Sequence, residues 1–132
     1  MKRLTVLLAT IACCMFFYID AKVLRNYSTT TDPVQAIRVD SIDFRPDLIR
    51  VYASLLGIPH TSGRIDDVTL MVGKRAAKAT DIDGIDINRY YQWEDDGIIP
   101  VEIDFPPMPQ FKYAQIVLNT VRGESVSNIK VK

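Results

Sequence analysis

The sequence predicts a mostly β or α+β fold, in which an antiparallel β-meander forms a small sandwich or barrel with one short helix near residues 46–56. Two observations predict the strands. Apolar and polar residues alternate through the C-terminal two-thirds of the chain, and Asp-Gly pairs separate the alternating runs. The third observation, apolar residues at helical spacing before a glycine, predicts the helix.

The first 21 residues are typical of a removable secretion signal. They begin with two basic residues, continue with an apolar run over residues 4–19, and end at Ala21, a small residue that suits cleavage. This segment has three alternative interpretations: an uncleaved membrane anchor, a lipoprotein signal at Cys13, or a buried N-terminal element. Because both cysteines, Cys13 and Cys14, lie in this segment, the secreted chain would form no disulfide.

Two regions follow the proposed signal. Residues 22–36 are predicted to be a flexible N-terminal segment, and residues 37–132 a single globular β-rich domain. Asn26 begins the triplet Asn-Tyr-Ser, an acceptor for N-glycosylation in a eukaryotic secretory pathway. A glycan at this position would mainly solubilise the flexible segment.

The predicted helix has apolar residues at helical spacing: Leu48, Ile49, Tyr52, Leu55 and Leu56. Pro46 suits the first turn of a helix, and Gly57 suits its end. A strand through residues 48–52 is the alternative.

The predicted strands begin near Ile65 and continue to the end of the chain. Asp83-Gly84 predicts a hairpin between residues 76–82 and 85–93, and Asp96-Gly97 a second hairpin between 85–93 and 98–105. Two more strands are expected over residues 111–121 and 125–131. Proline donates no backbone hydrogen bond, so the strand that contains Pro100 lies at a sheet edge there or carries a bulge.

Charge composition narrows the possible partners. The chain has 16 basic and 16 acidic residues, and removal of the signal leaves 14 basic and 15 acidic residues. A chain without basic excess releases few counterions from DNA or RNA, so we expect no nucleic-acid binding. It also lacks a polybasic patch for anionic lipids, and we expect no stable membrane insertion after signal cleavage.

The common catalytic and metal-binding templates do not fit the sequence. His60 is the only histidine, and no nucleophile motif surrounds it, so we interpret it as a solvated loop residue. The stretch from Asp81 to Asn88 lacks the first and last ligands of a calcium loop. The sequence therefore predicts no enzyme, no catalytic residue, no metal and no cofactor.

Acidic and aromatic residues near two predicted turns form the candidate contact region. A secreted binding protein would use it to contact an extracellular protein or a small ligand. The candidate partner-binding residues are Asp81, Asp83, Asp86, Tyr90, Glu94, Asp95 and Asp96.

Two further functions are alternatives. The motif Gly73-Lys74-Arg75 is typical of a processing site in secretory precursors, where it would release a peptide ending at an amidated Val72. A hydrolase that works with two carboxylates would use Glu102 and Asp104, which alternate onto one face of a strand.

From Gly63 onward the chain resembles the insect secreted family named after multiprotein bridging factor two. The segment from Gly63 to Val72 is similar to the family's strand with a "D-x-L-V" pattern, and residues 113–120 to its later "I-T-x-I-x-A-x-D" strand. The Asp of that later strand and the "S-Q-R-G" ending have no counterpart in this chain. The resemblance implies a small secreted β-protein, and it transfers no catalytic or binding residue.

Overall fold

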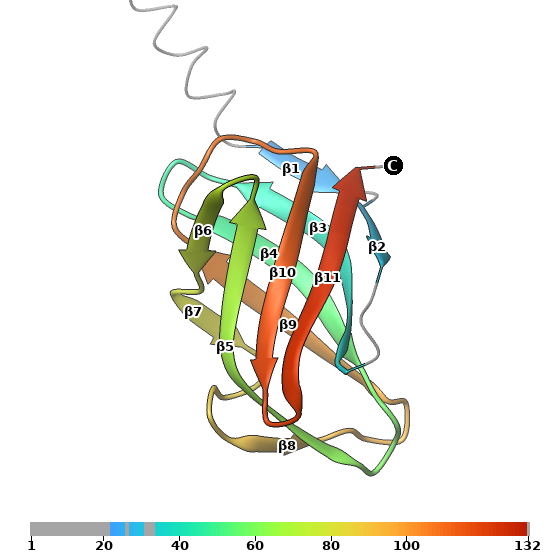
Figure 1. Cartoon of the computed structure of the whole chain (residues 1–132). Coiled ribbons are helices and arrows are strands. Elements are labelled where there is room, and N and C mark those ends of the chain that lie inside the picture. The colour runs from blue at the N-terminus through green and yellow to red at the C-terminus, as the bar shows by residue number, and fades with distance from the viewer. Residues whose placement is uncertain (1–21, 26, 31–33, 132) are drawn as a thin grey trace, which may run out of the picture.

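The described part of the chain forms eleven β-strands in two antiparallel sheets and contains no helix (Figure 1). The computed structural model describes residues 22–25, 27–30 and 34–131. The predicted signal segment 1–21 with its cleavage residue Ala21, and the glycosylation acceptor Asn26, lie outside the described residues.

The first sheet has five strands in the spatial order β1-β3-β4-β9-β7. In chain order the bounds are β1 (Lys22–Arg25), β3 (Ala36–Phe44), β4 (Ile49–Leu56), β7 (Asp81–Asp83) and β9 (Ile98–Phe105).

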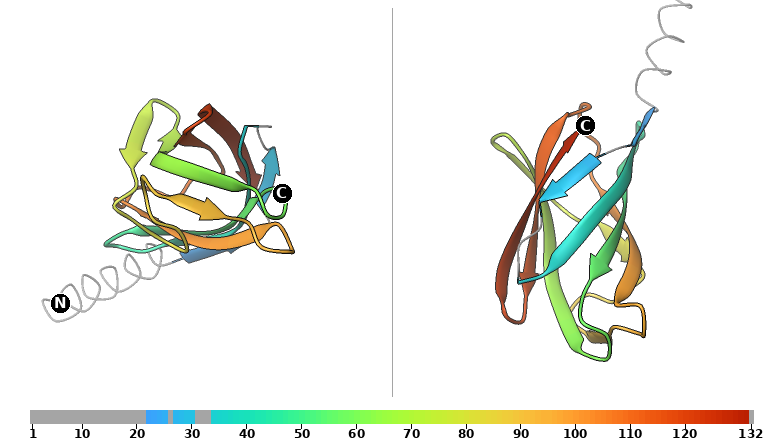
Figure 2. Two further views of the ribbon diagram at one scale, coloured as in Figure 1. Left: turned by 90° about the horizontal axis from the view of Figure 1, so that it is seen from below. Right: turned by 90° about the vertical axis from the view of Figure 1, so that its right-hand side faces the viewer.

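The second sheet has the order β2-β11-β10-β5-β6, and β8 pairs with the beginning of β5. The two sheets face each other as separate layers and do not close into a barrel (Figure 2). The bounds are β2 (Tyr27–Thr30), β5 (Ser62–Val72), β6 (Arg75–Lys78), β8 (Tyr90–Gln92), β10 (Tyr113–Thr120) and β11 (Gly123–Val131).

One hydrophobic core fills the space between the sheets. Alternate residues of each long strand point inward, because successive side chains of a strand lie on opposite faces. The largest fully buried side chains come from both sheets and from the segment after β8: Trp93, Phe105, Ile37, Ile42, Ile49, Leu55, Ile65, Leu70, Ile103, Ile116, Leu118 and Ile129.

The prediction of a helix near residues 46–56 is wrong. Residues 49–56 form β4, which pairs with β3 on one side and β9 on the other. Ile49, Val51, Ala53 and Leu55 are all buried, so the alternation of period two determined the structure rather than the helical spacing. Pro46 lies in the β3–β4 turn, not in a first helical turn.

The two predicted Asp-Gly hairpins also differ from the structure. Gly84 and Gly97 have positive φ angles of 108° and 66°, so both dipeptides do turn the chain. However, β7 pairs with β9, and β8 pairs with β5. The turns therefore redirect the chain between different strand partners instead of closing local hairpins.

Other expectations agree with the structure. β10 and β11 form a continuous antiparallel hairpin, in which Val121 and Arg122 turn the chain and Gly123 pairs with Thr120. β7 covers only the part of β9 from Glu102 to Asp104. Among the described strands, β4 alone pairs with β9 at Pro100, as predicted for an edge. The segment 22–36 does not share this agreement: it was predicted to be flexible, but residues 22–25 and 27–30 form β1 and β2 at the edges of the two sheets.

Candidate functional site

The candidate site lies at one edge of the second sheet, where the pairing of β5 is interrupted. β6 pairs with residues 69–72 of β5, and β8 pairs with residues 62–64. Between them, residues 65–68 pair with none of the described strands on that side. The register of β5 with β10 also shifts here. Asp67 lies opposite Asn119 and Ile65 opposite Thr120, so two steps along β5 correspond to one step along β10. Asp66 is therefore the extra residue of a β-bulge.

The segment 79–88 spans this interruption and connects the two sheets. At its start, the Ala79 N–H donates to the Val68 carbonyl at 2.9 Å, and the Thr80 N–H donates to the Asp104 carbonyl at 2.8 Å. At its end, the Asn88 N–H donates to the Ile65 carbonyl at 2.9 Å. Backbone hydrogen bonds thus hold both ends of the segment, while its centre stands away from β5.

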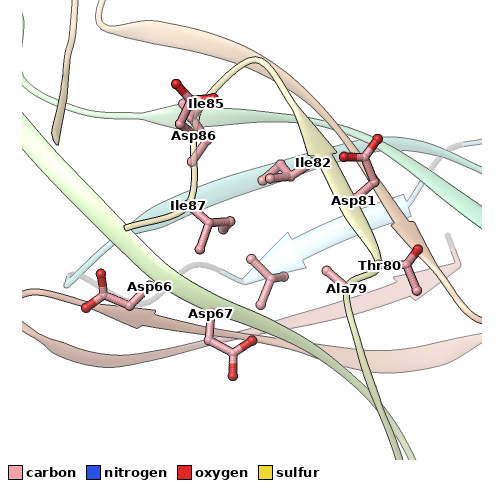
Figure 3. A pocket seen from close by; sticks show the side chains of 10 residues that line it. Asp66, Asp67, Ala79, Thr80, Asp81, Ile82, Ile85, Asp86 and Ile87 are labelled. Carbon is pink, nitrogen blue, oxygen red and sulfur yellow. The ribbon is translucent and has the colours of Figure 1, made fainter. Parts of the chain in front are cut away.

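A pocket of about 330 Å³ lies between this segment and β5, and we call it the edge pocket. Figure 3 shows apolar side chains turned toward its centre and carboxylates at its periphery, directed away from the centre. The apolar lining residues are Val68, Ala79, Ile82, Ile85 and Ile87, and the carboxylates are Asp66, Asp67, Asp81 and Asp86.

Three of the four carboxylates have a cationic partner outside the pocket lining. Arg64 Nε lies 2.8 Å from Asp66 Oδ1, Lys78 Nζ lies 3.5 Å from Asp67 Oδ2, and Arg89 Nη1 lies 3.9 Å from Asp86 Oδ2. Asp81 has no ion-pair partner within the described ranges. The periphery of the edge pocket therefore carries one uncompensated negative charge and two weakly paired ones.

The structure divides the predicted contact region into three places. Asp81 and Asp86 line the edge pocket. Asp83 lies two residues after Asp81 on the same face of β7, and it borders a shallow hollow on the outer face of the first sheet, together with Asp40 and Glu102. The sequence had grouped these carboxylates because they are close along the chain.

Tyr90 and the acidic residues that follow it do not line the edge pocket. Tyr90 is exposed on β8, with the Arg64 guanidinium 5.3 Å from its ring centre. Glu94, Asp95 and Asp96 lie in the loop after β8, which is hydrogen-bonded to the β4–β5 loop. β8 and the loop that follows it, which carry these four residues, lie at one end of the sandwich (Figure 1).

His60 belongs to the same end of the molecule and is exposed, as the sequence predicts. Its backbone N–H donates to the Trp93 carbonyl, and its imidazole Nε2 lies 2.9 Å from Oδ1 of the exposed Asp95 carboxylate. Its φ angle of 65° is in the left-handed region, which suits a turn residue. No serine hydroxyl is hydrogen-bonded to it among the described residues.

The structure places Gly73-Lys74-Arg75 at the tip of the β5–β6 hairpin. Val72 pairs with Arg75, so Gly73 and Lys74 are the two central turn residues. Gly73 has a φ angle of 60°, as two-residue hairpin turns require.

The carboxylates of the hydrolase alternative have different environments. Asp104 is nearly buried and accepts two hydrogen bonds from Arg50, at 2.8 and 3.0 Å. These hydrogen bonds lower the pKa of Asp104 below its usual value. A carboxylate-based hydrolase needs one carboxyl that keeps its proton, so this ion pair does not supply its acid. Glu102, in contrast, borders the outer hollow.

The edge pocket contains two acidic residues that the sequence analysis did not single out, Asp66 and Asp67. A signal for them exists in the sequence. The buried residues Ile65 and Val68 are three positions apart, whereas regular alternation requires an even spacing. This break in the period predicts a bulge, and bulges are frequent beside binding sites.

The described residues contain neither a metal-binding cluster nor a membrane-spanning helix. Among residues 22–25, 27–30 and 34–131, no three His, Cys, Asp or Glu side chains are arranged to hold a metal ion. No helix in the same ranges is long and apolar enough to cross a membrane. Comparisons with protein-family models, with curated proteins and with solved structures gave no match to this chain.

Proposed function

We propose that the protein is a small secreted, non-enzymatic binding protein, and that the edge pocket is its ligand site. The observation that carries this proposal is the pocket itself, which has an apolar interior and a polar periphery. Small-molecule sites commonly combine these two features, in cavities of about 300–1,000 Å³.

The local backbone supports the same proposal. The bulge at Asp66 interrupts the pairing of β5 beside the pocket, and a continuous strand neighbour would close this space. Bulges persist where they redirect side chains or end strand pairing near a site. Hydrogen bonds at both ends of segment 79–88 fix the position of this wall of the pocket relative to β5.

Secretion is part of the proposal and rests on the signal-like segment 1–21. N-terminal sequencing of the protein recovered from the medium of secreting cells tests it. We expect a chain that begins at Lys22. An intact Met1 in a membrane fraction would support the anchor instead, and a lipidated Cys13 would support the lipoprotein.

A fragment screen by NMR on the secreted chain tests the binding site. We expect apolar fragments to shift the amide resonances of Val68, Ala79 and Ile87 more than those of the outer sheet faces. Ala79→Leu fills the pocket and should abolish these shifts. Ala76→Leu, on the exposed edge of β6, is the matched control and should leave them unchanged. The proposal is wrong if no fragment of any charge binds in the pocket.

A further inference from the structure

We infer that the outer face of the first sheet binds an arginine side chain presented by a partner polypeptide. The site is the outer hollow that Asp40, Asp83 and Glu102 border. The outer hollow and the edge pocket share no lining residue. The inference therefore adds a second site to the proposed function and does not depend on it.

Two carboxylates of the outer hollow lie directly opposite each other on neighbouring strands. Asp83 of β7 pairs with Glu102 of β9, so both side chains lie on the same face of the sheet. Like charges in this arrangement repel each other and destabilise a sheet. Within the described part of the chain, neither carboxylate has an ion-pair partner. A bound cation would remove this repulsion.

The adjacent row of the same sheet shows how the fold compensates such a pair. Asp81 lies opposite Asp104, and the residue of β4 in that row is Arg50. Arg50 donates two hydrogen bonds to Asp104, at 2.8 and 3.0 Å. In the row of the outer hollow, the corresponding residue of β4 is Tyr52. This second row therefore has two carboxylates and an aromatic ring where the first row has a guanidinium.

A nearly buried hydroxyl also faces the outer hollow. Ser54 follows Tyr52 by two positions on β4, so its side chain points to the same outer face. Ser54 is only 5 % exposed and lines the hollow, yet its hydroxyl forms no hydrogen bond with any described residue. An N–H of a ligand can donate to this oxygen, which would otherwise stay unpaired in a largely dry position.

An arginine side chain complements all of these groups. Its planar guanidinium has five N–H donors and no acceptor, so it can bridge two carboxylates and donate to the Ser54 oxygen. It also stacks well on aromatic rings, and the Tyr52 ring lines the hollow. An anion would meet only carboxylates, since the lining contains no Lys, Arg or His. A metal ion does not fit, because the described residues include no group of three suitable ligands.

The shape of the outer hollow favours a side chain from a partner polypeptide over a free small molecule. The hollow has a volume of about 480 Å³ and opens widely to solvent from the sheet face. A small molecule there would keep much of its surface in water and gain little from burial. A partner polypeptide covers the surrounding sheet while its arginine enters the hollow, and arginine is enriched among the residues that dominate such interfaces.

Peptides that differ at one position test the inference. Each is a capped pentapeptide with glycine on both sides of a central arginine, lysine, citrulline or glutamate, titrated into the secreted chain and followed by the amide resonances of Ser54, Val101 and Glu102. Citrulline has the shape of arginine without its charge. We expect binding to weaken in the order arginine, lysine, citrulline, and no binding of the glutamate peptide. Raising the salt from about 20 mM to about 500 mM should weaken binding of the arginine peptide.

Single substitutions identify the residues that hold the arginine. Glu102→Gln and Asp83→Asn should each weaken the arginine peptide by about fivefold, the scale of one charge contact in water. Asp47→Asn removes the same charge from the exposed β3–β4 turn, so it is the matched control and should bind like the wild type. Ser54→Ala should weaken the arginine peptide by about threefold, the scale of one hydrogen bond.

The repulsion between the two carboxylates can be measured without a ligand. Glu102→Gln should raise the urea midpoint of the free protein, whereas Asp47→Asn should leave it unchanged. A lower midpoint for Glu102→Gln would show that the carboxylates do not repel each other, which would remove the basis of the inference.

The binding results separate this inference from the proposed function. The inference fails if the citrulline peptide, or a neutral sugar such as glucose, binds in the outer hollow as tightly as the arginine peptide. It also fails if Glu102→Gln and Asp47→Asn act alike on binding, or if none of the peptides moves the resonances of the hollow. The proposed function stands in each of these cases, because its test follows the edge pocket.

Discussion

Trp93, the only tryptophan, joins the two loops at one end of the sandwich. Its side chain is buried and packs edge-to-face with Tyr91, with ring centres 5.0 Å apart. The indole also lies against Gly57, where a Cβ would come within 2.2 Å of the ring, and less closely against Gly63. The indole N–H has no acceptor among the described residues, so packing rather than hydrogen bonding holds this ring.

Gly57→Ala should destabilise the protein through this contact. A Cβ at position 57 would lie 2.2 Å from the indole of Trp93, so the ring or the loop must move. We expect a loss of about 1–3 kcal/mol in the free energy of unfolding, measured with urea. In a Trp93→Phe background, which removes the fused ring, the same substitution should cost less. Equal costs in the two backgrounds would contradict the proposed contact.

The Arg50–Asp104 ion pair should matter more than the exposed Arg38–Asp40 pair. Arg50→Met leaves a nearly buried carboxylate without its partner, so we expect a clear fall in the urea midpoint. Arg38→Met is the matched control, since both side chains of that pair are about half exposed, and its midpoint should barely change. Similar midpoints for the two variants would contradict this prediction.

The same pair predicts how stability responds to acid. Arg50 lowers the pKa of Asp104 in the folded protein. The ion pair therefore stabilises the fold fully above the pKa that Asp104 has in the unfolded chain. This stabilisation is lost as the pH falls through the lower pKa of Asp104 in the folded protein. Urea unfolding from about pH 5 to about pH 2 should therefore show a smaller acid dependence in Arg50→Met than in the wild type.

Tyr91 predicts a loss of stability in alkali. Partial burial raises the pKa of its phenol to about 12, above the ordinary value of 10.0. The pKa of Tyr91 is higher in the folded protein than in the unfolded chain. The contribution of the neutral phenol to the stability of the fold is therefore complete below pH 10 and is lost as the pH rises toward 12. Tyr91→Phe should show a smaller fall in the urea midpoint over this range. An identical fall in both proteins would assign the effect to other groups.

At the scale of elements, strand partners come from distant parts of the chain. β4 pairs with β9, and β2 pairs with β11, so neither sheet is built only from consecutive hairpins. β7 leaves the edge of β9 uncovered near Pro100, and Gly84 lies against the backbone of that residue. The segment 79–88 belongs to the first sheet through β7, and hydrogen bonds near its two ends attach it to β5 of the second sheet.

Cleavage at the β5–β6 hairpin should not release a peptide. Trypsin can cut after Lys74 or Arg75 at this exposed tip, but β5 remains paired with β10 along residues 65–71, and β4 with β9. We expect the nicked chain to elute with the intact protein in size-exclusion chromatography and to separate only in denaturant. Release of a fragment ending near Val72 under native conditions would favour the precursor alternative.

At the scale of the whole molecule, one core connects both sheets. Ile103 and Phe105 from β9 lie in the same buried cluster as Leu70 and Leu118 from the opposite sheet. Neither sheet can therefore keep its apolar face buried after the other unfolds. The edge pocket borders this core, since Val68 and Ile85 of its lining belong to the same buried cluster.

This shared core predicts a single cooperative unfolding transition. Trp93 fluorescence reports the end of the sandwich, and far-UV circular dichroism reports the strands of both sheets. The two signals should give the same urea midpoint, as two-state unfolding requires. An earlier fluorescence transition would show that the loops around Trp93 unfold separately.

The sequence by itself determined the β-rich character, the approximate positions of β5, β9, β10 and β11, and the β10–β11 hairpin. It also predicted an edge or a bulge at Pro100. These features depend on local patterns, since alternation specifies which side chains point inward and turn residues specify where the chain bends. Even the break in period at Asp66 and Asp67 can be read locally.

Only the tertiary structure decided the strand partners, and with them the site. Residues 49–56 became a strand because β3 and β9 pair with it on both sides, which no local spacing reveals. Asp81 and Asp86 lie beside Asp66 and Asp67 because segment 79–88 crosses between the sheets at the interruption of β5. Strand pairing joins residues far apart in the chain, so a period of two predicts which face a residue occupies but not which strand lies next to it.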